Sequence, residues 1–340
     1  WCAYAAFREL TPAKSGRGHA ALSILDERFR PCPEEAVRRS GLPDAAKGLV
    51  PRDEWDALHR ALSLRVPSDD TFERLVEAAW AFYRDVLGFE TVADYGFAKI
   101  MQVAPQSLLT LVNAADGMHT ADEPKSVTLA IMTEDVEAWY AHLKANDVPM
   151  RGELTIREGS AHDGFVAIDP EGYFLEFEWF NEHEENVRLS PQLAAIAPLQ
   201  TDARPDGLGI TGTVLWLYFD EMAPAEAFYE ELLDVDMIVD QGWAKVYPVS
   251  RTGYIGLVDA SRGLHQATQD KGVTMSFLTQ DVRTWLDRVR ALGIELRTPE
   301  ITMESDLVET FVAYDPTRYF MEWDTFLDKP GNERLIEAIR

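Results

Sequence analysis

Apolar side chains alternate with polar ones in short segments of the chain and recur every three to four residues in longer segments. The alternation predicts half-buried strands at Leu62–Val66, at Val127–Met132 and from about Tyr173. The apolar residues of Glu73–Leu87 fall on one face of a predicted helix, and Gly88 is suited to end it. These segments predict a protein that mixes strands and helices.

The remaining predicted elements complete a repeated order of one strand, one helix and three strands. A second helix is predicted from about Asp135, with its apolar residues on one face. Further short strands are predicted near Ala98–Val103, Leu108–Val112, Glu153 and Phe165. The order is βαβββ twice over, and it returns from Val214 to Trp323.

The chain contains two copies of one sequence. A shift of 146 residues places AFYRDVLGF at Ala81 on AFYEELLDV at Ala227, and TEDVEAW at Thr133 on TQDVRTW at Thr279. The register holds without a gap from about Ala81 to Phe180. A repeat of this length is a whole domain rather than a solenoid unit. We therefore expect two tandem modules.

Each copy closes with a turn and a strand that carries an acid among apolar residues. DPEGYFLEFEWF covers residues 169–180, DPTRYFMEWDTF covers residues 315–326, and Glu176 corresponds to Glu322. Strand alternation places Glu176 on one face with Phe174 and Glu178. In the second copy, Glu322 shares its face with Phe320 and Asp324. An acid on a half-buried face is a candidate general acid or base, or a group that binds a polar ligand.

The repeat and the composition of the flanking segments predict the domain boundaries. We expect an N-terminal extension, mostly helical or irregular, at 1–57; a first module at 58–182; a linker at 183–210; a second module at 211–328; and a helical tail at 329–340.

Charge and composition exclude several classes of protein. The net charge of −26 disfavours nucleic acid and anionic membranes as partners, and no apolar run is long enough to span a bilayer. Cys2 and Cys32 are the only cysteines, which excludes a disulfide scaffold. We expect a cytoplasmic protein, either a monomer with an internal pseudo-dimer or a homodimer. Secretion stays open because the chain begins at Trp1.

The paired βαβββ units, the AFYRDVLGF helix end, the strand before TEDVEAW and the closing DPEGYFLEFEWF resemble the vicinal oxygen chelate superfamily. This superfamily includes glyoxalase I, extradiol dioxygenases, methylmalonyl-CoA epimerase and bleomycin-resistance proteins. The resemblance covers about residues 60–180 and 212–326. It implies an α+β fold of two cup-shaped half-barrel modules, one per copy, each with its site inside the cup.

The resemblance also implies positions for a divalent metal such as Fe, Mn, Ni or Zn. The acid on the last strand corresponds to Glu176 or Glu322. The positions where histidine is usual hold Thr128 and Thr274, the first strands offer Ala61 and Val214, and a further position falls near Thr110 and Gly256. One acid per cup is too few for a standard site, so no cofactor is expected. A shifted metal site would combine Glu176 with His59 or His162.

Other residues recur in both copies and are candidate ligand-binding groups. The candidates are Thr128, Thr274, Phe174, Phe320, Lys99, Lys245, His119 and His265. The aromatic rings suit a flat or apolar ligand, and each histidine could act as a base or bind an anion. The alternatives are structural: the histidines would hold their loops, and Thr128, Thr274 or a lysine would hydrogen-bond the acids.

We therefore expect a protein that binds a small organic molecule in a cup. An enzyme of isomerase or lyase type, with Glu176 or Glu322 moving a proton, is the leading hypothesis. The alternatives are a metal-dependent dioxygenase or glyoxalase-like lyase, and a non-catalytic protein that sequesters its ligand, as resistance proteins do. No GxSxG, Walker, GxGxxG or HExxH motif is present to support another class.

Overall fold

The computed structural model describes residues 77–339. All of these residues belong to one compact unit, Leu75–Arg340. The predicted extension 1–57, the predicted strand Leu62–Val66, His59 and Ala61 lie outside the described residues.

The first described helix ends where the sequence predicts. It covers 77–86, and its last turn, η2 (Phe82–Val86), is a π-helix. The backbone N–H of Leu87 closes this turn by donating to the carbonyl of Phe82. Gly88 follows with φ of 64°, a left-handed conformation that glycine adopts without strain. The chain can therefore turn sharply into the first strand.

A three-stranded antiparallel sheet follows the helix. Its strands are β1 (Glu90–Asp94), β2 (Ala98–Ala104) and β3 (Ser107–Val112), in that order. The predicted strands near Ala98 and Leu108 are confirmed. β1 was not predicted, because its burial does not alternate and its register shifts at a bulge between Thr91 and Ala93.

The central sheet has seven strands in the order β5-β6-β4-β7-β10-β9-β8. The strands are β4 (Val127–Met132), β5 (His162–Ile168), β6 (Phe174–Phe180), β7 (Gly212–Phe219), β8 (Val239–Asp240), β9 (Ala244–Pro248) and β10 (Gly253–Asp259). The strand predicted near Glu153 is absent from this sheet; Met150 and Thr155 instead form isolated bridges to β5.

The central sheet joins the two copies of the repeat. β4 of the first copy pairs antiparallel with β7 of the second, with Ala130 opposite Val214. The expectation that each copy forms its own cup is therefore corrected: the second half of copy one and the first half of copy two share one sheet. The module boundaries at 58–182 and 211–328 remain a prediction from the sequence repeat.

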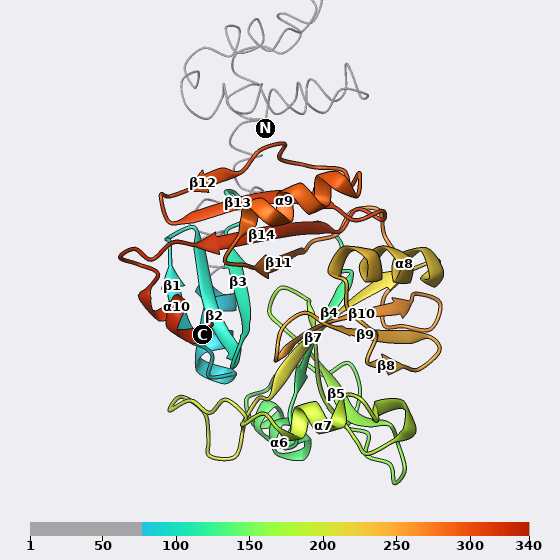
Figure 1. Cartoon of the computed structure of the whole chain (residues 1–340). Helices are drawn as coiled ribbons and strands as arrows, with labels where there is room; N and C mark the ends of the chain where they lie inside the picture. The colour runs from blue at the N-terminus through green and yellow to red at the C-terminus, as the bar shows by residue number, and fades with distance from the viewer. Residues whose placement is uncertain (1–76, 340) are drawn as a thin grey trace, which may run out of the picture. The chain divides into compact units, whose positions relative to one another are not determined.

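The third sheet has four strands in the order β11-β14-β13-β12. The strands are β11 (Thr274–Leu278), β12 (Thr302–Glu304), β13 (Val308–Tyr314) and β14 (Phe320–Phe326). It lies beside β1–β3 of the first copy (Figure 1). The Tyr95 hydroxyl after β1 donates to Asn332 Oδ1 at 2.5 Å, after β14. This second pairing again brings together parts of both copies.

Three helices cover one side of the sheets: α6 (Val136–Ala145), α8 (Met222–Leu233) and α9 (Val282–Ala291). Trp139 of α6 is fully buried against Phe177 of β6, and Tyr229 of α8 against Phe219 of β7. We call the opposite side of each sheet its inner face. The α+β fold with curled sheets is confirmed.

Short helices pack on the inner faces, where a linker and a tail were predicted. The predicted linker contains η3 (Glu184–Asn186) and α7 (Ser190–Ala194), and the tail contains α10 (Glu333–Ala338). Leu189 and Leu193 pack against Phe180 of β6. Leu335 packs in the same manner against Ile100 of β2. None of the helices in residues 77–339 has the length and apolar character needed to cross a membrane.

Candidate functional site

The paired acids of each closing strand lie on inner faces, as the alternation predicts. On β6, Leu175 and Phe177 join the core under α6, so Glu176 and Glu178 point to the other side. Glu178 is only 2% exposed, and Glu176 is half-buried. On β14, Glu322 and Asp324 repeat this arrangement. The inner faces of the seven-stranded and four-stranded sheets therefore each carry two neighbouring carboxyl groups.

The two acids of β6 have unusual proton affinities. Loss of solvation raises the pKa of Glu176 to about 7, although the positive charge of Arg151 opposes the shift. Desolvation and the neighbouring Glu176 raise the pKa of Glu178 well above its ordinary value. At neutral pH the pair therefore carries at least one proton, and Glu176 is poised to gain or lose one.

Three buried polar atoms around these acids have no hydrogen-bond partner: Oε1 of Glu178, Nε1 of Trp216 and Nε2 of His265. Trp216 lowers the pKa of Glu178 slightly, although the indole and the carboxyl group do not form a regular hydrogen bond. Buried polar groups in folded proteins usually have partners. A ligand with both donors and acceptors could supply them here.

Aromatic and cationic side chains lie beside the acids. The ring of Phe174 lies 4.5 Å from His265 and 5.3 Å beneath the guanidinium of Arg151. Tyr218 is 5.0 Å from His265, and its hydroxyl shares a 2.8 Å hydrogen bond with Thr128. We call Thr128, Arg151, Phe174, Glu176, Glu178, Trp216, Tyr218 and His265 the seven-stranded site.

The imidazole of His265 is neutral in this environment. Burial, followed by the charge of Arg151, lowers the pKa of His265 to about 4. A neutral imidazole with an unpartnered Nε2 can accept or donate one hydrogen bond, depending on its tautomer. His265 is therefore suited to orient a polar ligand on Phe174 without adding a charge.

The acids of β14 lie among hydroxyl groups. Thr310 donates to Oε1 of Glu322 at 3.4 Å, and Ser276 donates to Oδ2 of Asp324. Desolvation, followed by the charges of Asp324 and Glu304, raises the pKa of Glu322 to about 8. The pKa of Asp324 rises to about 6, mainly by desolvation.

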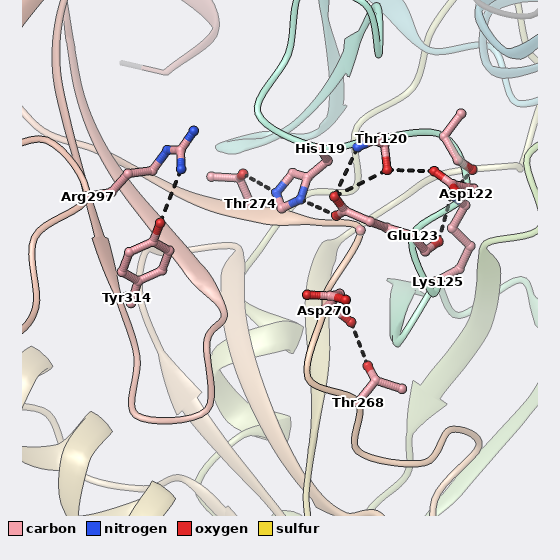
Figure 2. A network of polar contacts seen from close by, with 12 residues as sticks. His119, Thr120, Asp122, Glu123, Lys125, Thr268, Asp270, Thr274, Arg297 and Tyr314 are labelled. Carbon is pink, nitrogen blue, oxygen red and sulfur yellow. Dashed lines mark hydrogen bonds and ion pairs between the residues drawn. The ribbon is translucent and has the colours of Figure 1, made fainter. Parts of the chain in front are cut away.

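The neighbours of Glu322 are of the same types as those of Glu176, but the two copies have exchanged the residues that they contribute. His119 of copy one lies 4.4 Å from Phe320 of copy two, and Arg297 lies 5.1 Å from the same ring. Arg297 also donates to the hydroxyl of Tyr314 at 3.2 Å (Figure 2). We call His119, Thr274, Arg297, Tyr314, Phe320, Glu322 and Asp324 the four-stranded site.

Thr128 and Thr274 do not hydrogen-bond the acids. Thr128 pairs with Tyr218, and the hydroxyl of Thr274 lies 2.9 Å from Nε2 of His119. The structural alternative, in which these threonines hydrogen-bond Glu176 and Glu322, is corrected. Both hydroxyls instead face groups from the other copy. The histidines and phenylalanines predicted as ligand-binding groups do come together, one from each copy.

Lys99 and Lys245 lie apart from both acid pairs. Lys245 alternates on β9 with Ala244 and Val246, which face inward, so its own side chain points to the helix side. It pairs there with Asp240, as Lys99 pairs with Asp94 at 2.8 Å. These pairs brace their hairpins.

The residues at the family's metal positions do not fit a divalent ion in the seven-stranded site. Val214 and Thr128 replace ligands, and the ring of Trp216 covers Gly256, where an added Cβ would lie 1.9 Å from a ring carbon. His162 lies opposite Phe180, four residues along the strand from Glu176. That separation is about 13 Å, too far to share an ion.

The four-stranded site fits a metal no better within the part of the chain that the structure describes. Thr274 is engaged with His119, and Thr110 supplies only a hydroxyl. Across residues 77–339, no group of three or more His, Cys, Asp or Glu side chains converges as metal ligands do. We therefore derive no chemistry through a metal.

A pocket of about 430 Å³ opens elsewhere, between the start of α8 and the turn after β13. Its two buried charged groups, Lys271 and Asp315, are already engaged by the protein. Lys271 donates to the carbonyl of Thr268, and Asp315 accepts from the backbone N–H of Thr317 and of Tyr319. Of the residues of the two sites only Tyr218 lines it, so it is not the candidate site.

Several site residues were not predicted: Arg151, Arg297, Trp216, Tyr218, Ser276 and Thr310. Arg151 and Arg297 are separated by the repeat shift of 146 residues, and this recurrence was a usable signal. Ser276 and Thr310 had none, because the first copy has Ala130 and Gly164 in their places.

Curled sheets built from βαβββ units, with acids on their inner faces, define the vicinal oxygen chelate fold. Residues 71–177 match the model of the Glyoxalase/Bleomycin resistance protein/Dioxygenase superfamily.

Solved structures are similar in fold. Glyoxalase I from Zea mays aligns with a TM-score of 0.51 and 12% identity, covering 78% of this chain and 91% of that one. A putative dioxygenase from Bacillus subtilis subsp. subtilis str. 168 has a TM-score of 0.51 and 14% identity, over 76% and 85% of the two chains. No curated protein matches the sequence.

Proposed function

We propose that the protein binds a small carbonyl compound in the seven-stranded site and moves a proton on it, as an isomerase or lyase does. Glu176 is the proposed general base. The observation that carries the proposal is a carboxyl group with a pKa of about 7 on an inner face beside Phe174 and Arg151. A base whose pKa is near the working pH transfers protons most effectively.

Each neighbour of Glu176 has a place in this reaction. Phe174 supports a flat ligand, and Arg151 favours an anionic group or the negative charge that develops on a carbonyl oxygen. The unpartnered Nε2 of His265 can hydrogen-bond the ligand. Burial raises the pKa of Glu178 well above its ordinary value, and in its protonated form this acid can donate a hydrogen bond, which a carboxylate cannot.

The experiment is proton exchange on carbon in deuterated buffer. We expect the protein to catalyse deuterium uptake next to the carbonyl group in at least one compound of a panel of small keto and hydroxy acids, followed by proton NMR. Glu176→Gln should reduce the rate by about 10²-fold or more while ligand binding persists. Glu322→Gln, at the corresponding position of the other copy, is the matched control.

The same measurement separates this proposal from a sequestering function. The aromatic surround and the unpartnered atoms support binding even without turnover. Calorimetric binding of a compound by the wild-type protein, with no exchange in any compound of the panel, would favour sequestration.

A metal-dependent dioxygenase or glyoxalase-like lyase is the other candidate, and the two similar folds support it. Metal analysis of the purified full chain tests it. Stoichiometric Fe, Mn, Ni or Zn that is lost in Glu176→Gln or His59→Ala would replace the proposal of metal-free proton transfer.

A further inference from the structure

Three side chains of the four-stranded site form a continuous hydrogen-bonded line (Figure 2). Oε2 of Glu123 lies 2.7 Å from Nδ1 of His119, and Nε2 of His119 lies 2.9 Å from Oγ1 of Thr274. The carboxylate is fixed by its other oxygen, which accepts from the backbone N–H of Thr120 at 3.1 Å. The line crosses between the copies, because Thr274 starts β11.

The chemistry of the three groups sets the direction of each hydrogen bond. An ionised carboxylate only accepts, so Nδ1 of His119 carries the proton that faces Glu123. Nε2 is then the acceptor, and the hydroxyl of Thr274 donates to it. A hydroxyl that donates to a histidine oriented by an acid is the arrangement that activates a nucleophile.

The seven-stranded site contains the equivalent positions without the same line. His265 corresponds to His119, but Gln269 stands where Glu123 would be. Nε2 of His265 has no partner, and Thr128 is paired with Tyr218 instead. A line needed only to hold the fold would be expected in both copies. The chain therefore provides its own matched control.

We propose that Glu123, His119 and Thr274 form a nucleophilic triad that hydrolyses small activated carboxylic esters. The side chains of His119 and Glu123 are 18% and 23% exposed, and Thr274 is partly exposed, so a small ester can reach the hydroxyl. Arg297 lies over the Phe320 ring that also contacts His119, where its charge can stabilise a developing oxyanion. This activity does not depend on Glu176.

The reaction balances without any further reagent. Oγ1 of Thr274 bonds to the ester carbonyl carbon while its proton passes to Nε2 of His119. The bond from that carbon to the leaving oxygen breaks, and the His119 proton is released to the leaving group or to water. Water then attacks the acyl-threonine ester and gives a proton to His119; the bond between the acyl carbon and Oγ1 breaks, and His119 returns the proton to Oγ1, which yields the acid and free Thr274. Glu123 acts only as a positioning residue.

The test uses p-nitrophenyl acetate with the full chain. We expect a burst of about one equivalent of nitrophenolate and an acetyl group that peptide mass mapping locates on Thr274. Thr274→Val should abolish the burst, whereas Thr274→Ser, which keeps the hydroxyl, should retain it. Glu123→Gln should slow acylation roughly tenfold or more, and Glu123→Asp should recover part of the rate.

Thr155→Val, at an exposed threonine outside both sites, should leave the burst unchanged. Thermal melting of each variant identifies any that do not fold, and Thr274→Ser then decides in place of Thr274→Val. The proposal is overturned by an acetyl group on another residue, by no adduct on the wild-type chain, or by equal burst rates in Thr274→Val and wild type. Any of these results would mean that the hydrogen-bonded line only links the two copies structurally.

Discussion

The four acids on the inner faces have different surroundings. Ser276 and Thr310 donate hydroxyl groups to the acids of β14, whereas Ala130 and Gly164 stand at the corresponding positions beside β6. Glu178 is left with an unpartnered oxygen. The acids of β6 are therefore free to interact with a ligand, and those of β14 are partly held by the protein.

Glu322→Gln should stabilise the folded protein at alkaline pH. The pKa of Glu322 is raised from about 4.5 in the unfolded chain to about 8 in the fold, so the fold binds more protons between these values. The contribution of Glu322 to the stability of the fold is fully present below its pKa in the unfolded chain. This contribution is lost as the pH rises through its pKa in the folded protein. The neutral amide should remove this loss, adding about 1 to 3 kcal/mol at pH 8 and flattening the slope between pH 5 and 8.

Urea unfolding at a series of pH values measures this slope. Glu309→Gln is the control: an ion pair with Arg283 lowers the pKa of Glu309, so its removal should not relieve a loss at high pH. A pH slope in Glu322→Gln equal to that of the wild type would show that Glu322 does not titrate in this range.

The inner-face position of these acids followed from the alternation within one strand, which is a local property. The partners of the acids did not follow, since Thr310, Arg151 and Trp216 lie on other elements. Which side chain meets another across a sheet depends on strand order and register, and alternation carries no information on either. The direction of a side chain was thus predictable, whereas its neighbours were not.

Among the elements, η3 with α7 and the segment before α10 are two examples of one capping unit. NVRL at 186–189 corresponds to NERL at 332–335 under the same shift of 146 residues. Asn186 and Asn332 are both fully buried, and each amide donates to two backbone carbonyls. The first was predicted as part of a linker because its prolines and acids suggested an exposed segment, although the shared Asn-x-Arg-Leu was the available signal.

Leu335→Ala should destabilise the protein by about 2 to 5 kcal/mol, the cost of a cavity in a packed core. Leu335 is 0% exposed and packs with Val92, Ala93 and Ile100, which links the end of the chain to β1 and β2. Leu189→Ala should have a similar effect in the other capping unit. Chemical denaturation measures both.

The exposed Glu337→Ala in the same helix is the control and should change stability by less than about 0.5 kcal/mol. A Leu335→Ala variant as stable as this control would mean that α10 is not part of the folded core.

At the scale of the whole molecule, both candidate sites need both copies. His265 and Phe174 meet across the copies in one site, and His119 and Phe320 meet across them in the other. The hydroxyl of Tyr319 donates to the carbonyl of Ser126, and that of Tyr173 donates to the carbonyl of Gly272. The sequence predicted the two copies, but a repeat alone does not indicate whether each copy closes on itself or on the other.

Separating the copies should therefore prevent folding. The β4–β7 ladder runs without interruption from Val127 opposite Leu217 to Met132 opposite Gly212, and a fragment of residues 211–340 would expose this edge of β7. Unpaired edge strands drive aggregation or self-association. We expect fragments 1–200 and 201–340 to be insoluble or self-associated when expressed singly, and to form a stable 1:1 complex when expressed together.

Size-exclusion chromatography with light scattering measures the mass of each product, and circular dichroism measures its cooperative melting. The control is the full chain with a protease site inserted beside Asp206 in the 201–207 loop and cut after purification. It shows whether breaking the backbone in this loop is by itself enough to unfold the protein. A monomeric 201–340 fragment that melts cooperatively would show that each copy is an independent module. In such a fragment, β7 would have to pair with a strand of its own copy in place of β4. That result would also mean that the histidine and the acids of each site come from a single copy.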